Sequence, residues 1–280
     1  MRIARCFYIA SICLSLATSI SVAESPNENA SASQRDAWSA YYAAQLPQYK
    51  FFLADHPDQP LELPDATLRW SNPLRPGTHG DMFVWSHQGR GVLVGSLFSY
   101  YHAKNVRRVA HQFQSLTTDT IVCQHTGGSD FRIEGPGLKF TPIQDAPAPA
   151  DNRVVRLTQM RMLSRSFKAS CMNKGVYQPL RGLPQPVYRF EGEAIEDDGA
   201  IFAYVMGTDP ELLLVISVHQ TPDGPQWQYA AARFASEPLQ LTRNGETVWD
   251  FDDTSKQLGY LSKHGIDLQP DMLMVNMPSE

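Results

Sequence analysis

Apolar and polar positions alternate along most of the chain after residue 68, and this spacing predicts antiparallel β-strands. Apolar runs over 82–85 and 92–98 flank a turn-like segment at 87–90, an arrangement typical of a β-hairpin. Helical spacing occurs over 34–46 and over about 152–170. The pattern therefore predicts a mainly β (α+β) protein with an N-terminal helix and a second helix that links two β regions.

Several short segments recur at nearly constant spacing, which indicates two related halves. Residues 68–70 resemble 188–190, 80–85 resemble 199–204, 92–96 resemble 213–217, 113–115 resemble 234–236, and Phe131 matches Trp249. Chance similarity between hydrophobic hairpins is the alternative explanation. A small sheet with one apolar face is marginal alone, so two such antiparallel units are expected to pack as one sandwich or barrel-like body.

Composition divides the chain into six predicted segments. These are a signal peptide (1–23), a leader with the N-terminal helix (24–60), a first β half (61–145), a linker with a basic helix (146–175), a second β half (176–250) and a C-terminal tail (251–280). The stretch 47–64 contains four prolines and is expected to be extended or irregular.

The N-terminus has the features of an export signal. Arg2 and Arg5 precede an apolar run over 6–20, and Ser21-Val22-Ala23 ends this run with a small residue. An N-terminal membrane anchor is the alternative, but the run is short for a membrane span. Cleavage after Ala23 removes two arginines and no acid, so the formal net charge changes from −5 to −7. We therefore expect a periplasmic or extracellular protein that has no membrane span after cleavage and does not bind nucleic acid.

Two cysteines, Cys123 and Cys171, remain after cleavage. In an oxidising compartment they can form one disulfide or stay as buried thiols, and the spacing does not decide between these. Their separation excludes the usual zinc sites built on paired cysteines. The sequence also lacks phosphate-binding and dinucleotide-binding loops, so no metal site and no cofactor are predicted.

The candidate catalytic residues are His79, Asp81 and His111. His79 and Asp81 stand two residues apart at the start of a predicted strand, so their side chains share one face, as an acid/base pair or metal ligands require. His111 is expected to assist from a neighbouring strand. The structural alternative is that His79 closes a turn and Asp81 caps a loop. At the matching positions the second half has Asp198 and Ala200.

The candidate ligand-binding residues are Trp70, Arg156, Arg161 and Arg165. The three arginines belong to a segment over 152–174 that carries six cations and no acid, and guanidinium groups suit anionic ligands. Internal pairing with the acidic run over 191–198 is the alternative. A tryptophan such as Trp70 can stack on a sugar or aromatic ring, or it can simply be part of the core.

Six motifs resemble a family of exported bacterial proteins of unknown function. They cover roughly residues 60 to 250 and lie at 70–73, 83–90, 156–161, 183–190, 207–211 and 227–233. The resemblance implies one recurring unit and brings no activity, cofactor or catalytic residue. The leading hypothesis from sequence is an exported, non-catalytic module that binds an anionic ligand, another small molecule or a protein partner. The alternative is a His/Asp-dependent or metal-assisted hydrolase centred on the first half.

Overall fold

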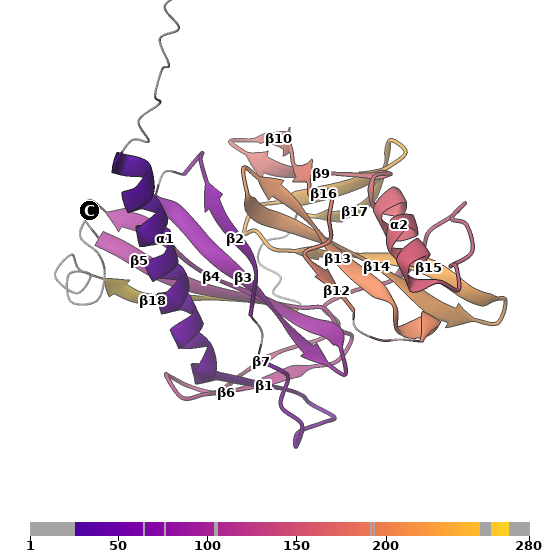
Figure 1. The fold of residues 1–280 in the computed structure, drawn as a ribbon, viewed down its shortest axis with the longest axis horizontal. Helices are drawn as coiled ribbons and strands as arrows, with labels where there is room; N and C mark the ends of the chain where they lie inside the picture. The colour runs from indigo at the N-terminus through magenta and orange to yellow at the C-terminus, as the bar shows by residue number, and fades with distance from the viewer. Residues whose placement is uncertain are drawn as a thin grey trace, which may run out of the picture.

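Two large antiparallel sheets form the centre of the molecule (Figure 1). The computed structural model describes residues 26–252 and 259–268, apart from positions 64, 76, 104, 105, 191 and 193. The first large sheet has the order β18-β5-β4-β3-β2, with β2 Ala66–Asn72, β3 Thr78–His87, β4 Arg90–Ala103, β5 Val106–Ser115 and β18 Tyr260–Leu268. The second has the order β11-β13-β14-β15-β8, and β12 also pairs with β13. Its strands are β8 Thr141–Pro142, β11 Arg181–Gly182, β12 Tyr188–Arg189, β13 Gly199–Met206, β14 Asp209–Thr221 and β15 Gly224–Arg233.

Each large sheet has a smaller sheet and a helix on its outer side. The first half contains α1 Pro26–Gln45, the 3-10 helix η1 Leu46–Gln48, and a sheet of β1 Tyr49–Leu53, β6 Ile121–His125 and β7 Phe131–Ile133. The second half contains α2 Arg153–Ser164, the 3-10 helix η2 Ile195–Asp197, and a sheet of β9 Phe167–Asn173, β10 Val176–Pro179, β16 Leu239–Arg243 and β17 Glu246–Phe251. In Figure 1, α1 and α2 lie at opposite ends of the molecule.

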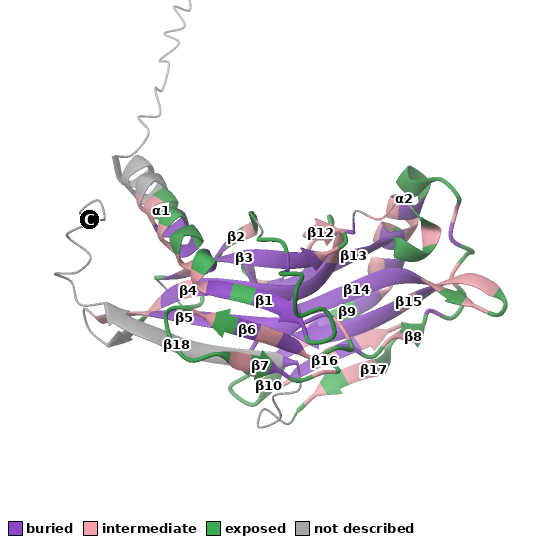
Figure 2. Cartoon of the chain, turned by 90° about the horizontal axis from the view of Figure 1, so that it is seen from below, coloured by how far each residue is buried: buried purple, intermediate pink, exposed green. Residues whose placement is uncertain are grey.

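The alternation of side chains along the strands creates three cores, and the central strands are the most buried part of the molecule (Figure 2). Phe83 and Trp85 of β3 face α1 and the small sheet of the first half, whereas Met82 and Val84 face the opposite way. Met82 and Val84 meet residues of the second large sheet, and we call this cluster the shared core. Its buried members are Met82, Val84, Val94, Leu116, Leu138, Phe190, Ile201, Ala203, Val205, Leu213, Val215, Ala230, Ala232 and Phe234. The two large sheets therefore pack face to face, which confirms the prediction of a mainly β protein made of packed antiparallel sheets. The sheets do not close into a barrel.

The same strand order recurs in the two halves. The order β2-β3-β4-β5 has its counterpart in β12-β13-β14-β15, and β1-β6-β7 has its counterpart in β9-β16-β17. The pairing of Tyr49 with His125 recurs 118 residues later as Phe167 with Arg243. The register of the β3–β4 pair shifts after Trp85, and the register of the β13–β14 pair shifts at the equivalent position, after Tyr204. The repeat thus extends from strand order to the register of individual pairs.

Two of the sequence matches are displaced. The segment 92–96 was matched to 213–217, but Val94 pairs with Val84 as Leu213 pairs with Ala203, so this match is displaced by two residues. The match of 113–115 is displaced by three residues. The segment 113–115 was matched to 234–236, but the hydrogen bond from Leu116 N to Val92 O corresponds to that from Phe234 N to Glu211 O. Leu116 and Phe234 also lie together in the shared core. The match of 113–115 was wrong because both stretches place a phenylalanine near a strand end, and only the pairing fixes the register.

The boundaries of both predicted helices differ from the structure. The first helix begins at Pro26 rather than near residue 34. The second begins after Asn152, whose side chain accepts hydrogen bonds from Val154 N and Val155 N, and ends at Ser164 rather than near 170. The residues that follow alternate between buried and more exposed positions, and they form β9. The stretch 47–64, expected to be irregular, includes β1.

From the sequence, Cys123 and Cys171 could form a disulfide or remain as thiols. Among the described residues no disulfide is formed, and both side chains are buried thiols. They belong to separate cores, Cys123 to that of the first half and Cys171 to that of the second. The predicted signal peptide lies outside the described residues. Among the residues that the structure describes, neither helix combines the length and apolar character that crossing a membrane requires.

Candidate functional site

A pocket of about 400 Å³ lies between α1 and the edge of the first large sheet. Its walls come from α1, β2 and β3, and the second half contributes one residue at the rim. The lining residues are Arg35, Asp36, Trp38, Ser39, Tyr42, Arg69, Trp70, Ser71, His79, Gly80, Asp81 and Thr208. Three of the residues singled out from the sequence, Trp70, His79 and Asp81, therefore line the same pocket.

Both nitrogen atoms of the His79 ring have protein partners. The Tyr42 hydroxyl lies 3.2 Å from His79 Nδ1, and Arg107 Nη1 lies 3.1 Å from Nε2. Because a guanidinium can only donate, Nε2 accepts and the proton is on Nδ1, facing the Tyr42 oxygen. The Tyr42 hydroxyl in turn donates to Ser99 Oγ over 2.8 Å. The imidazole is thus held in one tautomer by this network.

The electrostatic surroundings keep His79 neutral. Burial and the nearby Arg107 lower the pKa of His79 to about 4. The Trp38 ring packs edge-on against the imidazole, with 5.3 Å between ring centroids. A neutral histidine with both nitrogens engaged is suited to shaping the pocket rather than to transferring protons.

Asp81 is the buried acid of the pocket. It has an exposed fraction of 3%, and burial raises the pKa of its carboxyl group. A hydrogen bond from Ser39 on α1 and the charge of Arg69 on β2 partly offset this rise. Arg69 itself forms an ion pair with Asp36, at 2.7 Å, near the rim. The Asp81 carboxyl group lines the pocket, and its oxygen atoms can accept a hydrogen bond from a ligand.

Trp70 forms part of the pocket wall, but its polar group is already used. Its exposed fraction is 6%, and its Nε1 donates to Ser96 Oγ over 3.1 Å. Its ring lies 5.6 Å from that of Phe98. Trp70 thus contributes an apolar surface that is fixed from behind.

His111 lies outside this pocket. Its strand β5 is separated from β3 by β4, and both His111 and Asp81 pair with Leu97. The His111 Nδ1 atom forms a hydrogen bond with the Tyr49 hydroxyl of β1. The structure thus places His111 against the small sheet of the first half and does not bring it to His79.

The arginines of the basic helix do not gather around Trp70, because α2 belongs to the second half. Arg156 has an exposed fraction of 2% and pairs with the buried Asp198, with 2.6 Å between Nε and Oδ2. Arg161 hydrogen-bonds to Gln185, and Arg165 follows the last turn of the helix. For Arg156, the structure shows the internal pairing that was the alternative to ligand binding. Its partner, Asp198, is the last residue of the acidic run over 191–198.

The two halves fill equivalent places with different chemistry. Asp198 corresponds to His79, and Arg156 stands 118 residues after Trp38. In the first half the two equivalent residues are Trp38 and the neutral His79, which pack together. In the second half they are Arg156 and Asp198, which form a buried ion pair. The two places therefore differ in the groups that they offer to a ligand.

The sequence missed the partners of His79 and Asp81 that come from other elements. Ser39 and Tyr42 are on α1, and Arg107 is on β5. The apolar stripe of the first predicted helix included Tyr42, but a stripe alone does not show which sheet it covers. Arg107 carried no motif signal, because its role depends on strand order.

Comparisons with known proteins do not extend this picture. No family model, no curated protein and no solved structure matches the chain.

Proposed function

We propose that this chain is an exported, non-catalytic binding module that takes a small polar ligand in the pocket between α1 and β3. The observation that carries the proposal is the combination of a buried carboxylate, Asp81, with aromatic walls and a rim that bears both charges. Concave sites with apolar walls and a few convergent polar groups are typical of small-molecule binding. The proposal of export depends on the N-terminal signal pattern.

The pocket favours a ligand that donates hydrogen bonds. Asp81 as a carboxylate can only accept, so an amine or hydroxyl group suits it. Trp38 and Trp70 make the wall apolar, but with exposed fractions of 2% and 6% they leave little ring surface for stacking. An anionic ligand would find Arg35 and Arg69 at the rim, but Arg69 is paired with Asp36 and the buried Asp81 would repel the ligand.

The occupied ring of His79 supports a non-catalytic role. A His/Asp hydrolase needs an imidazole nitrogen that can take a proton from the nucleophile. Here Arg107 donates to one nitrogen and Tyr42 contacts the other, while burial keeps the ring neutral. The charge of Arg107 opposes protonation of the ring, so this environment disfavours the step that hydrolysis would require.

We also propose that the two halves descend from one ancestral unit. The shared strand order, the equivalent registers and the recurring register shift support this origin. The difference between the His79 place and the Asp198 place is then a divergence between copies, in which the first copy keeps a ligand pocket and the second copy has an internal ion pair.

Ligand-observed NMR on the protein without residues 1–23 tests the proposed function. The panel contains amines, sugars and other polyols, and carboxylates and phosphates. Amines or polyols are expected to bind, and Asp81→Asn should weaken their binding by about tenfold or more, since hydrogen bonds to charged groups are the stronger ones. Asp223→Asn, in the exposed hairpin between β14 and β15, is the matched control and should leave binding unchanged.

Two results would overturn the proposal. One is binding that is the same in Asp81→Asn as in the unaltered protein. The other is chemical conversion of a bound compound that is lost in His79→Ala, because it would make the pocket an active site.

A further inference from the structure

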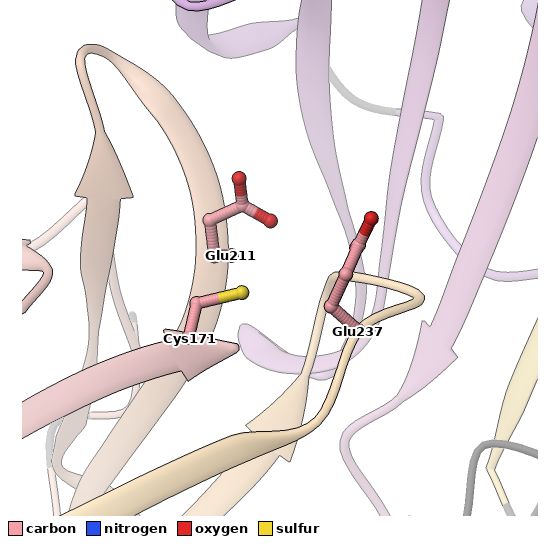
Figure 3. Close-up of side chains that lie close together, drawn as sticks. All are labelled: Cys171, Glu211 and Glu237. Carbon is pink, nitrogen blue, oxygen red and sulfur yellow. The ribbon is translucent and has the colours of Figure 1, made fainter. Parts of the chain in front are cut away.

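A second group of reactive side chains lies in the second half, away from the pocket at α1. Cys171 of β9, Glu211 of β14 and Glu237 of the segment between β15 and β16 each present a ligand atom, and these atoms lie within 4.8 Å of one another. Figure 3 shows the three side chains projecting into the same space. They come from three segments that are distant in sequence, so the fold alone brings them together.

The group is buried and rich in acidic side chains. Cys171 and Glu211 have exposed fractions of 3% and 4%. Asp209, also buried, is next along the same side of β14, and its carboxylate accepts a hydrogen bond from Asn72 over 2.9 Å. Burial and the neighbouring carboxylates raise the pKa of Glu211 to about 8. Such a concentration of acids in the interior is unfavourable as carboxylates unless protons or a cation neutralise their charge.

Glu211 is the more deeply buried of the two glutamates. Within the part of the chain that the structure describes, no hydrogen-bond donor contacts its carboxylate. Buried carboxylates are normally paired or hydrogen-bonded, or they coordinate a metal. Arg75 from the first half lies close to the group, but its 2.8 Å contact is with Oε1 of Glu237. The other Glu237 oxygen and the Glu211 carboxylate remain available to a cation.

We propose that Cys171, Glu211 and Glu237 bind a divalent transition-metal ion of the zinc class where the two halves meet. Sulfur and carboxylate oxygen together suit Zn²⁺ and related ions, whereas Ca²⁺ and Mg²⁺ prefer oxygen ligands alone. The contact from Arg75 to Glu237 Oε1 would orient that ligand, as partners of metal-bound carboxylates commonly do. This site is independent of the proposed ligand pocket.

Binding releases the thiol proton, together with the proton that Glu211 carries below about pH 8. Burial and the nearby carboxylates raise the pKa of Cys171 to about 12, so the thiol is protonated in the metal-free protein. The ion forms its bond to sulfur as the S–H bond breaks and the proton leaves to solvent. Sequence spacing gave no sign of this site, because it uses one cysteine with two glutamates rather than paired cysteines.

Metal titration of the chelator-treated protein tests the site. Co²⁺ followed by absorption should show one ion per chain with a thiolate-to-cobalt charge-transfer band, and Zn²⁺ should displace it. Cys171→Ser should abolish the band. Glu211→Gln and Glu237→Gln should each weaken Zn²⁺ binding by about tenfold or more. Glu237 is only partly buried, so its variant is expected to fold even where a core substitution does not.

Three control variants distinguish metal binding at this site from binding elsewhere in the protein. Cys123→Ser changes the other buried cysteine, Glu196→Gln changes an exposed acid, and Asp81→Asn changes the proposed ligand pocket. All three should bind Co²⁺ and Zn²⁺ like the unaltered protein. The proposal is overturned if the unaltered protein shows no charge-transfer band, if the band persists in Cys171→Ser, or if Glu237→Gln binds Zn²⁺ with unchanged affinity.

Discussion

Asp198 is fully buried and lies between two guanidinium groups, with 2.6 Å to Arg156 Nε and 2.8 Å to Arg189 Nη2. Removing the carboxylate would leave Arg156 buried without its counter-charge. We therefore expect Asp198→Ala to lower the free energy of unfolding by about 3–5 kcal/mol, measured by urea denaturation. Glu196→Gln, on the exposed part of the same acidic run, should change it by less than about 0.5 kcal/mol. Equal effects of the two substitutions would mean that the ion pair contributes nothing.

His79 gives a second prediction, on the pH dependence of stability. Its folded pKa of about 4 lies below the usual value of 6.5, so between these pH values the unfolded chain binds more protons. The free energy of unfolding should therefore rise with pH across this window, by at most about 1.4 kcal/mol per pH unit from this group, and the contribution should be lost as the pH falls toward 4. His79→Gln should reduce the slope in urea denaturations from pH 4.5 to 7.

His219 provides the comparison for that experiment. Burial and Arg90 lower the pKa of His219 to about 4, so His219→Gln should remove a similar part of the slope. A slope that is the same in His79→Gln as in the unaltered protein would show that His79 is protonated equally in both states.

The residue scale also shows what sequence spacing can and cannot supply. Two residues apart on a strand, His79 and Asp81 had to share a face, and the structure directs both toward α1. Spacing could not indicate that Arg107 would occupy His79 Nε2, because that contact depends on which strands are neighbours. Nor could it place Cys171 beside Glu211 and Glu237, which meet through tertiary packing alone.

At the scale of elements, the long hairpins were predictable and the short strands were not. The turn between β3 and β4 places Gln88 and Gly89 at φ 51° and 76°, a two-residue turn whose geometry suits the twist of the strands on each side. β1 has five residues between proline-containing stretches, so its pattern is too short to identify. The end of α2 was missed for a related reason: apolar residues at 163 and 167 fit a helix as well as the start of β9.

The contact of α1 with the first large sheet depends on Tyr42, and adjacent tyrosines on this helix allow a matched test. Tyr42 is 1% exposed and its hydroxyl contacts His79 and Ser99, whereas Tyr41 is only partly buried. Tyr42→Phe should lower the free energy of unfolding by about 1–3 kcal/mol, because buried polar groups lose their partner. Tyr41→Phe should have a much smaller effect. Denaturant unfolding measures both, and equal losses would argue against an anchoring role for the Tyr42 hydroxyl.

At the scale of the whole molecule, the shared core couples the two halves. It is built from equivalent positions: Met82 and Val84 of β3 correspond to Ile201 and Ala203 of β13, and Val94 of β4 corresponds to Leu213 of β14. Each half therefore presents nearly the same apolar face to the other. Because neither face is covered without its partner, the two halves are expected to unfold together in one cooperative transition.

The same equivalence predicts how an isolated half behaves. The segment 139–252, which keeps β8 with the second large sheet, would expose the Ile201, Ala203 and Leu213 face, and a second copy offers the matching positions needed to cover it. Such a self-complementary patch is the requirement for a symmetric dimer. We expect this segment, measured by size-exclusion chromatography with light scattering, to form dimers or larger assemblies. Leu213→Lys in the segment should disrupt them by placing a charge in the contact. A folded, soluble monomer of the unaltered segment would contradict this expectation, because it would show that the shared core is not needed to cover that face.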